Sequence, residues 1–151
     1  MAGRYFDEWT VGDTLSHEIR RTVTETDNLL FTTMTHNPQP LHLDAVAAGE
    51  SEFGRILVNG TFTFALMVGL SVGDTTLGTL VANLGYDELR MPAPVFIGDT
   101  LRAETEVAEL RESKSRPEAG IVTFRHRLLN QDDKVVCECL RSALIKRSGA
   151  A

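Results

Sequence analysis

The sequence predicts an α+β fold in which a mostly antiparallel sheet wraps around one long buried helix. Residues 60–72, GTFTFALMVGLSV, carry no charge and are apolar on nearly every side, which is typical of a helix surrounded by protein. Four strand-like segments follow this run. Their connections are too short for the crossovers that parallel strands require, so these strands must pair mostly antiparallel. One apolar helix on one face of such a sheet gives a layered α+β domain.

The length and composition of the chain fit a single domain that spans residues 1–151. The chain is 42% hydrophobic and 24% charged, as globular proteins commonly are. Its formal net charge of −6 argues against nucleic acid as a general partner. No apolar run is long enough to cross a bilayer, and the first residues, MAGRYFDEWTVGD, lack the apolar core of a signal peptide. We therefore expect no membrane partner and a cytoplasmic location.

The first third of the chain predicts one strand followed by irregular helical segments. Residues 16–25 alternate well enough for a strand, and Thr26 is a plausible N-cap for a short helix in DNLLFTTMT. The segment THNPQP is expected to be a loop, because Asn37 precedes a proline and is pushed towards an extended conformation. Asp44 can cap a helical turn over residues 45–48.

The last half of the chain alternates as strands do. In TLRAETEVAEL, one face is expected to carry Leu101, Ala103, Thr105 and Val107. His126 lies between two arginines in a strand and is expected to be structural or interfacial. The two cysteines, Cys137 and Cys139, share a strand face; two thiols alone make no zinc site, so buried free thiols are expected. The four strands are predicted at residues 79–90, with Gly85 as a bulge, and at 100–110, 121–130 and 134–147.

A sheet wrapped around a single long helix is a hotdog fold. One helix cannot cover both faces and both edges of such a sheet. We therefore expect two protomers to pair into a continuous sheet, giving a homodimer or a higher homo-oligomer of dimers.

Three segments carry a resemblance to a known family. They are THNPQPLHLD at 35–44, FGRILVNGTFTFALMVG at 53–69 and PAPVFIGDTLRAETEV at 92–107. Together they resemble the MaoC-like dehydratases, also called (R)-specific enoyl-CoA hydratases, and the resemblance extends from about Phe6 to Lys146. It implies reversible hydration of 2-enoyl-CoA thioesters by a lyase. No metal site and no organic cofactor are expected, and coenzyme A enters only as part of the substrate.

The sequence departs from the motif of that family at two positions. The motif reads G-D-x-N-P-L-H-x-D, with a catalytic Asp five residues before the catalytic His; counting back from His42 gives Asn37. The histidine usual before the turn glycine is Asn59 here. The NPQPLH, VNG and SKSRP segments are most similar to itaconyl-CoA and mesaconyl-CoA hydratases, which implies a short branched dicarboxylic acyl group.

Hydration of an enoyl thioester needs a proton-transfer group and donors to the enolate oxygen. His42 suits the first task, because imidazole titrates near neutral pH. The start of the apolar helix suits the second, since the free amides of Gly60 and Thr61 can donate to a developing oxyanion. Gly60 also lets a ligand approach the backbone closely.

Asn37 leaves three interpretations open, because an amide cannot ionise. Asn37 can orient the water while His42 performs every proton transfer. Another group, Asp44 or His36, can supply the missing acid. Alternatively, the site is inactive as a hydratase. Asp44 also has a structural explanation as a helix cap, and His36 has one as a surface residue.

Substrate contacts can be assigned to several further residues. Asn59 either caps the helix or contacts the acyl carboxylate. Arg55 and Arg90 are candidates for binding a second carboxylate of the substrate. Lys114 and Arg116, in the loop RESKSRPEAG, could meet the phosphates of coenzyme A, although exposed loop charges are usually only solvated.

Two rival functions fit the same fold. A hotdog acyl-CoA thioesterase would release a free thiol from its substrate, although the NPQPLH loop favours a hydratase. A catalytically decayed acyl-CoA-binding subunit would bind ligand without turnover, and Asn37 is the residue that motivates this alternative.

Overall fold

The computed structural model describes residues 3–149 and has the α+β architecture that the sequence predicts. Its elements follow the predicted order of one strand, a helical region, one long helix and four strands. They are η1 (Phe6–Glu8), β1 (Thr14–Thr22), α1 (Glu25–Met34), α2 (Pro40–Leu43), α3 (Ala45–Glu50), α4 (Gly60–Thr75), β2 (Leu80–Arg90), β3 (Thr100–Glu112), β4 (Ala119–Leu129) and β5 (Val135–Lys146).

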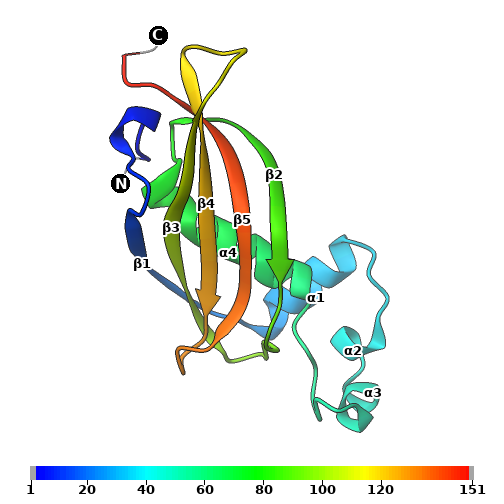
Figure 1. Cartoon of the computed structure of the whole chain (residues 1–151). Coiled ribbons are helices and arrows are strands. Elements are labelled where there is room, and N and C mark those ends of the chain that lie inside the picture. Colours follow the sequence, from blue (N-terminus) through cyan, green and yellow to red (C-terminus); the bar gives the residue numbers. More distant parts are fainter. Residues whose placement is uncertain (1–2, 150–151) are drawn as a thin grey trace.

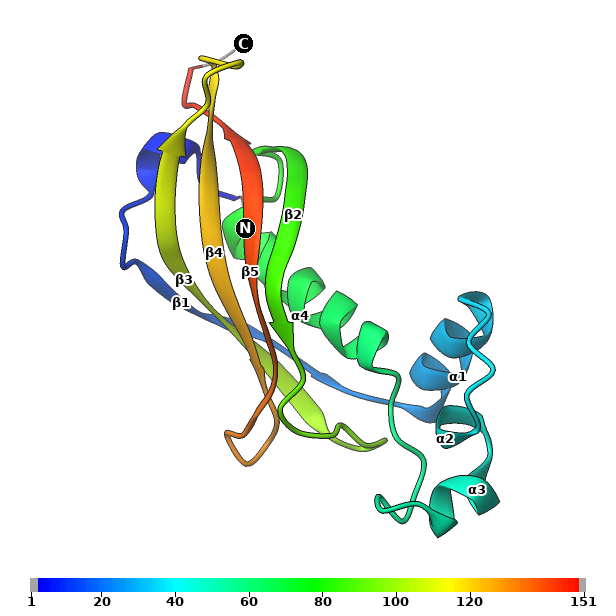
Figure 2. The same cartoon turned by 45° about the vertical axis from the view of Figure 1, so that its right-hand side comes forward.

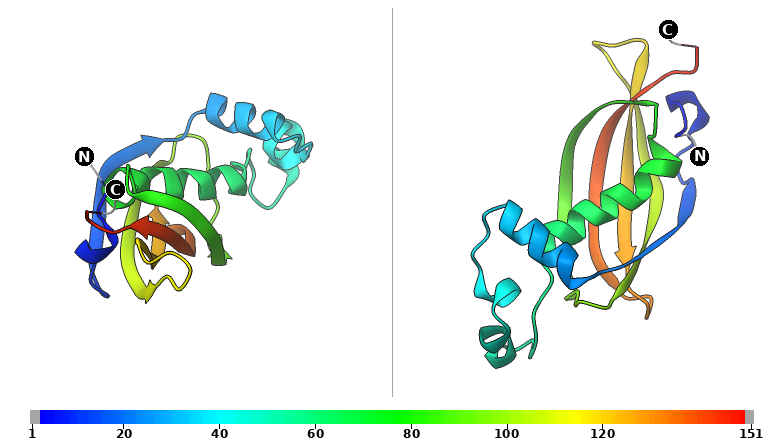
Figure 3. Two further views of the ribbon diagram at one scale, coloured as in Figure 1. Left: turned by 90° about the horizontal axis from the view of Figure 1, so that it is seen from above. Right: turned by 180° about the vertical axis from the view of Figure 1, so that it is seen from behind.

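The five strands form one sheet in the order β1-β3-β4-β5-β2, and every neighbouring pair is antiparallel. The sheet is strongly curved, and α4 runs along its concave face (Figures 1 and 3). This is the predicted hotdog arrangement. Two strands, β1 and β2, are left as sheet edges.

The core lies between α4 and the sheet. Met67 and Leu70 of α4 pack into one buried cluster with residues of β3, β4 and β5. The predicted inward face of β3 is confirmed, since Leu101, Ala103, Thr105 and Val107 are all buried. Cys137 and Cys139 are free and buried, as predicted, and burial raises the pKa of their thiols to about 12 and about 11.

Helix α4 differs from the prediction in two respects. It continues to Thr75 rather than ending at residue 72, and the Thr76 N–H still donates to Val72 O. Packing on the sheet therefore overrides the local tendency of Gly73 to end a helix. The helix is also not buried on every side, because a stripe formed by Thr61, Ala65 and Gly69 is exposed.

The N-cap of α1 is Thr24, not the predicted Thr26. Thr24 Oγ1 accepts a hydrogen bond from Asp27 N, and the Asp27 carboxylate accepts one from Thr24 N. This reciprocal capping box needs an acidic or amide residue three positions after the cap, which the TETD segment supplies. The preceding strand, β1, accordingly ends at Thr22.

The segment between α1 and α4 is more helical than predicted. Pro40 begins a short helix, α2, where a loop is expected, because proline suits the first turn of a helix. Helix α3 begins after Asp44, as predicted, and continues to Glu50. Together α1, α2 and α3 form a lobe beyond the end of the sheet, next to the N-terminus of α4 (Figure 2).

A buried polar network lies at the other end of α4. The Asp74 carboxylate is 2.8 Å from His17 Nδ1, and His17 Nε2 is 2.7 Å from Thr105 Oγ1. Thr105 Oγ1 is in turn 2.8 Å from Nδ1 of His126, which is fully buried. Burial, together with Arg141 and His17, lowers the pKa of His126 to about 3, so the ring is neutral. The structural role predicted for His126 is confirmed.

Within residues 3–149, no helix combines the length and the apolar character needed to cross a membrane.

Candidate active site

His42 lies in α2 with its ring held by one backbone group. His42 Nδ1 is 2.7 Å from Leu57 O, and the side chain is half-buried. A carbonyl oxygen can only accept, so Nδ1 carries the hydrogen and Nε2 carries the lone pair of the neutral ring. The fold therefore fixes the tautomer in which Nε2 can remove a proton from water.

The segment that holds His42 is anchored to a second segment of the chain. Leu57 N donates to Leu41 O, which ties residues 57–58 to α2. Val58 N donates to Val95 O at 2.9 Å, and Leu57 forms an isolated bridge with Phe96. His42 is thus held against the Pro-rich segment that connects β2 to β3.

The N-terminus of α4 leaves one free donor at Gly60. Asn59 Oδ1 accepts from Thr61 N at 3.0 Å and from Thr61 Oγ1. The Thr61 amide is therefore not free, contrary to expectation, because an Asn N-cap satisfies it. Within residues 3–149, the Gly60 N–H donates to no other group. Asn59 is buried, and its Nδ2 donates to Thr32 Oγ1, so its side chain serves as the cap of α4.

A cavity of about 400 Å³ lies beside Gly60. Leu57, Val58 and Gly60 line one side, and residues 91–95 line the other. Apart from Gly60 and the Thr63 hydroxyl, its lining side chains are apolar, and none is charged. The thioether of Met91 lies over Gly60, since a Cβ added there would be 2.5 Å from Met91 Sδ. The backbone carbonyl that holds the His42 ring thus belongs to Leu57, a residue of the cavity wall.

Asn37 and His36 terminate α1. Asn37 N donates to Thr32 O, and Asn37 Oδ1 accepts from Gln39 N at 3.0 Å. His36 has φ of 55°, the left-handed conformation that follows many helices and favours glycine. The motif quoted above has a glycine at this position, and the left-handed backbone conformation explains that preference. The His36 side chain is exposed.

Asp44 is the N-cap of α3, the structural alternative that the sequence allows. Its Oδ1 accepts from Val46 N at 2.9 Å and from Ala47 N at 3.1 Å.

The four candidate cations do not line the cavity. The Arg55 guanidinium stacks over the Phe96 ring at 3.9 Å. Arg90 lies at the end of β2, opposite Glu138 of β5. Lys114 and Arg116 lie in the β3–β4 hairpin, at the end of the sheet away from Gly60 (Figure 1).

Asn28 is a site residue that sequence reasoning missed. It lies in α1, is 2% exposed, and touches both halves of the site. Its Nδ2 donates to His42 O at 3.0 Å, and its Oδ1 accepts from Asn59 N at 3.0 Å. In the sequence, Asn28 and Thr32 are merely two polar residues one helical turn apart. Only the direction in which α1 packs distinguishes them from polar residues on a solvent-exposed helix face.

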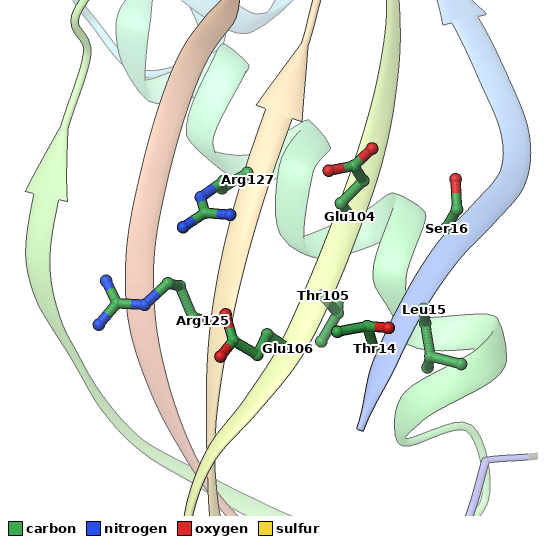
Figure 4. Close-up of a pocket in the computed structure, with 8 residues that line it drawn as sticks. All are labelled: Thr14, Leu15, Ser16, Glu104, Thr105, Glu106, Arg125 and Arg127. Carbon is green, nitrogen blue, oxygen red and sulfur yellow. The ribbon is translucent and has the colours of Figure 1, made fainter. Parts of the chain in front are cut away.

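A second hollow, of about 290 Å³, lies on the other face of the sheet (Figure 4). Glu104 and Glu106 of β3 lie beside Arg125 and Arg127 of β4 there, in opposing register. The two arginines also pair with Glu88 and Glu138 at 3.7 and 3.9 Å. Such alternating opposite charges are typical of a solvent-exposed sheet surface. They lie away from His42.

Among residues 3–149, no group of three or more His, Cys, Asp or Glu side chains is arranged to hold a metal ion. The cavity is lined by the polar groups of Gly60 and Thr63, and the His42 ring is held by the neighbouring lining residue Leu57. An imidazole and a backbone amide suit proton transfer and oxyanion binding.

Comparisons with known proteins show that the chain is similar to hydratases and to structures with the hotdog fold. The chain is 35% identical to a mesaconyl-CoA hydratase of Cereibacter sphaeroides over 99% of its own length. It is 36% identical to an (R)-specific enoyl-CoA hydratase of Aeromonas caviae, over 67% of this chain and 70% of that one. A Mycobacterium tuberculosis protein with a double hotdog fold superposes on 99% of the chain with a TM-score of 0.88, at 24% identity.

The chain spans only part of several of these proteins. It corresponds to 43% of the mesaconyl-CoA hydratase and to 46% of the double-hotdog protein. The MaoC like domain model matches residues 7–127, which include His42, Gly60 and Met91. On these grounds the chain belongs to the MaoC-like domain family.

Proposed function

We propose that the chain is a hydratase/dehydratase, a hydro-lyase that adds water reversibly to a short 2-enoyl-CoA thioester. One observation carries this proposal: Leu57 accepts the hydrogen bond that orients His42 and also lines the apolar cavity at Gly60. The names of the relatives, hydratases acting on mesaconyl-CoA and on enoyl-CoA, support the same reaction class.

In the proposed mechanism, His42 Nε2 removes a proton from water as the water oxygen attacks the β-carbon. The electron pair of the double bond moves towards the thioester, whose carbonyl oxygen accepts a hydrogen bond from the Gly60 N–H. The imidazolium then gives its proton to the α-carbon. Positioned acid–base catalysis contributes about 10²–10⁴-fold, and one oxyanion donor about 3 kcal/mol.

Asn37 is proposed to orient the attacking water. Its Oδ1 is engaged with Gln39 N, whereas its Nδ2 makes no hydrogen bond to another residue of the described chain. An amide N–H can donate to the water oxygen but cannot exchange a proton with it. His42 therefore carries out both proton transfers. Asp44 and His36 act at helix ends in this proposal and supply no acid.

The cavity favours an uncharged acyl chain. Its lining has no charged side chain, and a carboxylate without a partner in such surroundings is strongly disfavoured. A second carboxylate, as in mesaconyl-CoA, would have to lie at the mouth of the cavity, where Arg55 or Arg90 would have to reach it. A direct comparison of crotonyl-CoA with mesaconyl-CoA tests this proposal, and the uncharged substrate is expected to have the higher kcat/KM.

A second copy of the chain is proposed to complete the coenzyme A site. Strand β2 is an unpaired edge with exposed Leu84, Tyr86 and Leu89, and α4 has its own exposed stripe. The relatives of roughly twice the length are consistent with two such units acting together. Antiparallel pairing of two β2 strands would bring the Lys114–Arg116 hairpin of one copy to the end where Gly60 of the other copy lies.

The test is the loss of the conjugated thioester absorbance when the protein is added to a panel of enoyl-CoA substrates. The proposal expects turnover without release of free coenzyme A. Thiol release at the same rate would instead show a thioesterase. Binding of acyl-CoA without turnover, unaffected by His42→Ala, would show an acyl-CoA-binding subunit.

A further inference from the structure

We infer that Asn28 is a positioning residue, which holds His42 and the Gly60 amide in one fixed geometry. This inference rests on the proposed function. It adds a component that neither the motif nor the relatives assign. A single buried amide, from a helix that contributes no reacting group, binds the backbone of both catalytic elements.

Besides a contact from Thr32 Oγ1 at 3.4 Å, the Asn28 side chain makes two hydrogen bonds to the backbone of the two proposed catalytic segments. Its Nδ2 donates to the carbonyl of His42 itself. Its Oδ1 accepts from the N–H of Asn59, the residue immediately before Gly60. The segments carrying His42 and Gly60 therefore meet at one planar group, so movement of either segment is resisted by the same side chain.

Only an asparagine side chain satisfies both segments at this position. His42 presents an acceptor and Asn59 presents a donor, and an amide has one group of each kind at the required spacing. Aspartate would keep the bond to Asn59 N but would face the His42 carbonyl with a second acceptor. Leucine, of similar size, would leave both backbone groups without a partner in a site that is 2% exposed.

The hydrogen bonds of Leu57 to Leu41 and to the His42 ring also tie the two segments together, but at residue 57, whereas Asn28 reaches Asn59, directly before Gly60. The His42 ring is oriented by Leu57, and the Asn59 side chain is held by Thr61 and Thr32. Loss of Asn28 therefore leaves the tautomer of His42 and the cap of α4 in place. The distance between Nε2 and the Gly60 N–H becomes less defined. Misplacement of reacting groups by about 1 Å can reduce the rate on the order of 10²-fold.

Three variants test the inference: Asn28→Leu, Asn28→Asp and Thr24→Ala. Thr24→Ala is the matched control, because it removes the N-cap of the same helix, α1, and leaves both Asn28 bonds intact. Steady-state hydration of an enoyl-CoA gives kcat and KM, and thermal melting monitors the fold. Asn28→Leu is expected to lower kcat about 10- to 100-fold with KM within about threefold, whereas Thr24→Ala lowers only the melting temperature.

Two further readouts keep the inference testable. If Asn28→Leu does not fold, Asn28→Asp tests the inference instead. It loses only the bond to His42, and it is also expected to lower kcat. An imidazole ¹H–¹⁵N correlation spectrum of His42 requires no turnover, and its signals are expected to broaden in the Asn28 variants but not in Thr24→Ala. A wild type without turnover refutes the proposed function alone. Equal kcat and equal His42 spectra in the Asn28 and Thr24 variants overturn the positioning role.

Discussion

The two ends of α4 place histidines in two different environments, and only one of them is proposed to take part in catalysis. At the N-terminal end, His42 is half-buried, and one backbone carbonyl fixes its tautomer beside an apolar cavity. At the C-terminal end, His126 is fully buried behind Thr105, His17 and Asp74. Each ring makes a hydrogen bond through Nδ1, but His126 is buried whereas His42 is partly exposed.

The two ends of α4 also differ in their electrostatics. Burial and the neighbouring Arg141 lower the pKa of His126 to about 3, so the ring is uncharged at neutral pH. At the N-terminal end, the Gly60 N–H donates to no other group within residues 3–149. The positive end of the helix dipole is thus left open where an oxyanion would form.

The largest expected effect comes from comparing a variant at His42 with a variant at His126. His42→Ala should lower kcat/KM by about 10²–10⁴-fold, because it removes the only proton-transfer group proposed at the cavity. His126→Leu should keep kcat within a small factor of the wild type and should change stability instead. Steady-state hydration assays on both variants check this contrast. Equal losses of activity in the two variants would refute it.

The second effect concerns the pH dependence of stability. His126 has a folded pKa near 3, below its ordinary value of 6.5, so the folded state excludes a proton that the unfolded state binds. Its contribution is fully present above about pH 6.5 and is lost as the pH falls towards 3. The free energy of unfolding from urea titrations at pH 7, 5 and 4 should therefore fall more steeply for the wild type than for His126→Leu. Parallel curves would contradict this assignment.

A smaller effect is expected at the cavity wall. Met91 lies over Gly60 and lines the cavity, so Met91→Ala should enlarge the space for the acyl chain. The ratio of kcat/KM for a six-carbon over a four-carbon enoyl-CoA should rise about 10-fold, as expected for a change of one or two methylene groups in an apolar pocket. Leu77→Ala, an exposed residue beyond the other end of α4, should leave that ratio unchanged.

The smallest effect is a gain in stability at the end of α1. His36→Gly should raise the free energy of unfolding by about 0.5–1 kcal/mol, because glycine adopts the left-handed conformation without strain. Chemical denaturation measures this change. Turnover should be unaffected, and a loss of activity would instead make His36 the missing acid.

The sequence was sufficient to predict most of the fold, because period-two alternation and one uncharged apolar run are local signals. The motif also pointed to His42, and the start of the apolar helix pointed to Gly60; the roles of both residues are proposals. It did not reveal that Asn59 uses the Thr61 amide, that Asn28 joins the two halves, or that a stripe of α4 is exposed. These features depend on which tertiary partner each polar group or helix face meets. The spacing of residues in the sequence does not specify that partner. The TETD segment does contain the capping-box signal for Thr24, but Thr26 is also a residue type that caps helices, so the sequence offered two candidate N-caps.

The central claim is that His42 and Gly60 face one acyl site. The most direct measurement is a ¹⁵N NMR titration with butyryl-CoA, a thioester that cannot be hydrated, following the Gly60 amide and the His42 ring. Both signals should shift along one saturable binding curve, while His126 stays unchanged. A shift of Gly60 without His42, or of His42 without Gly60, would contradict the account.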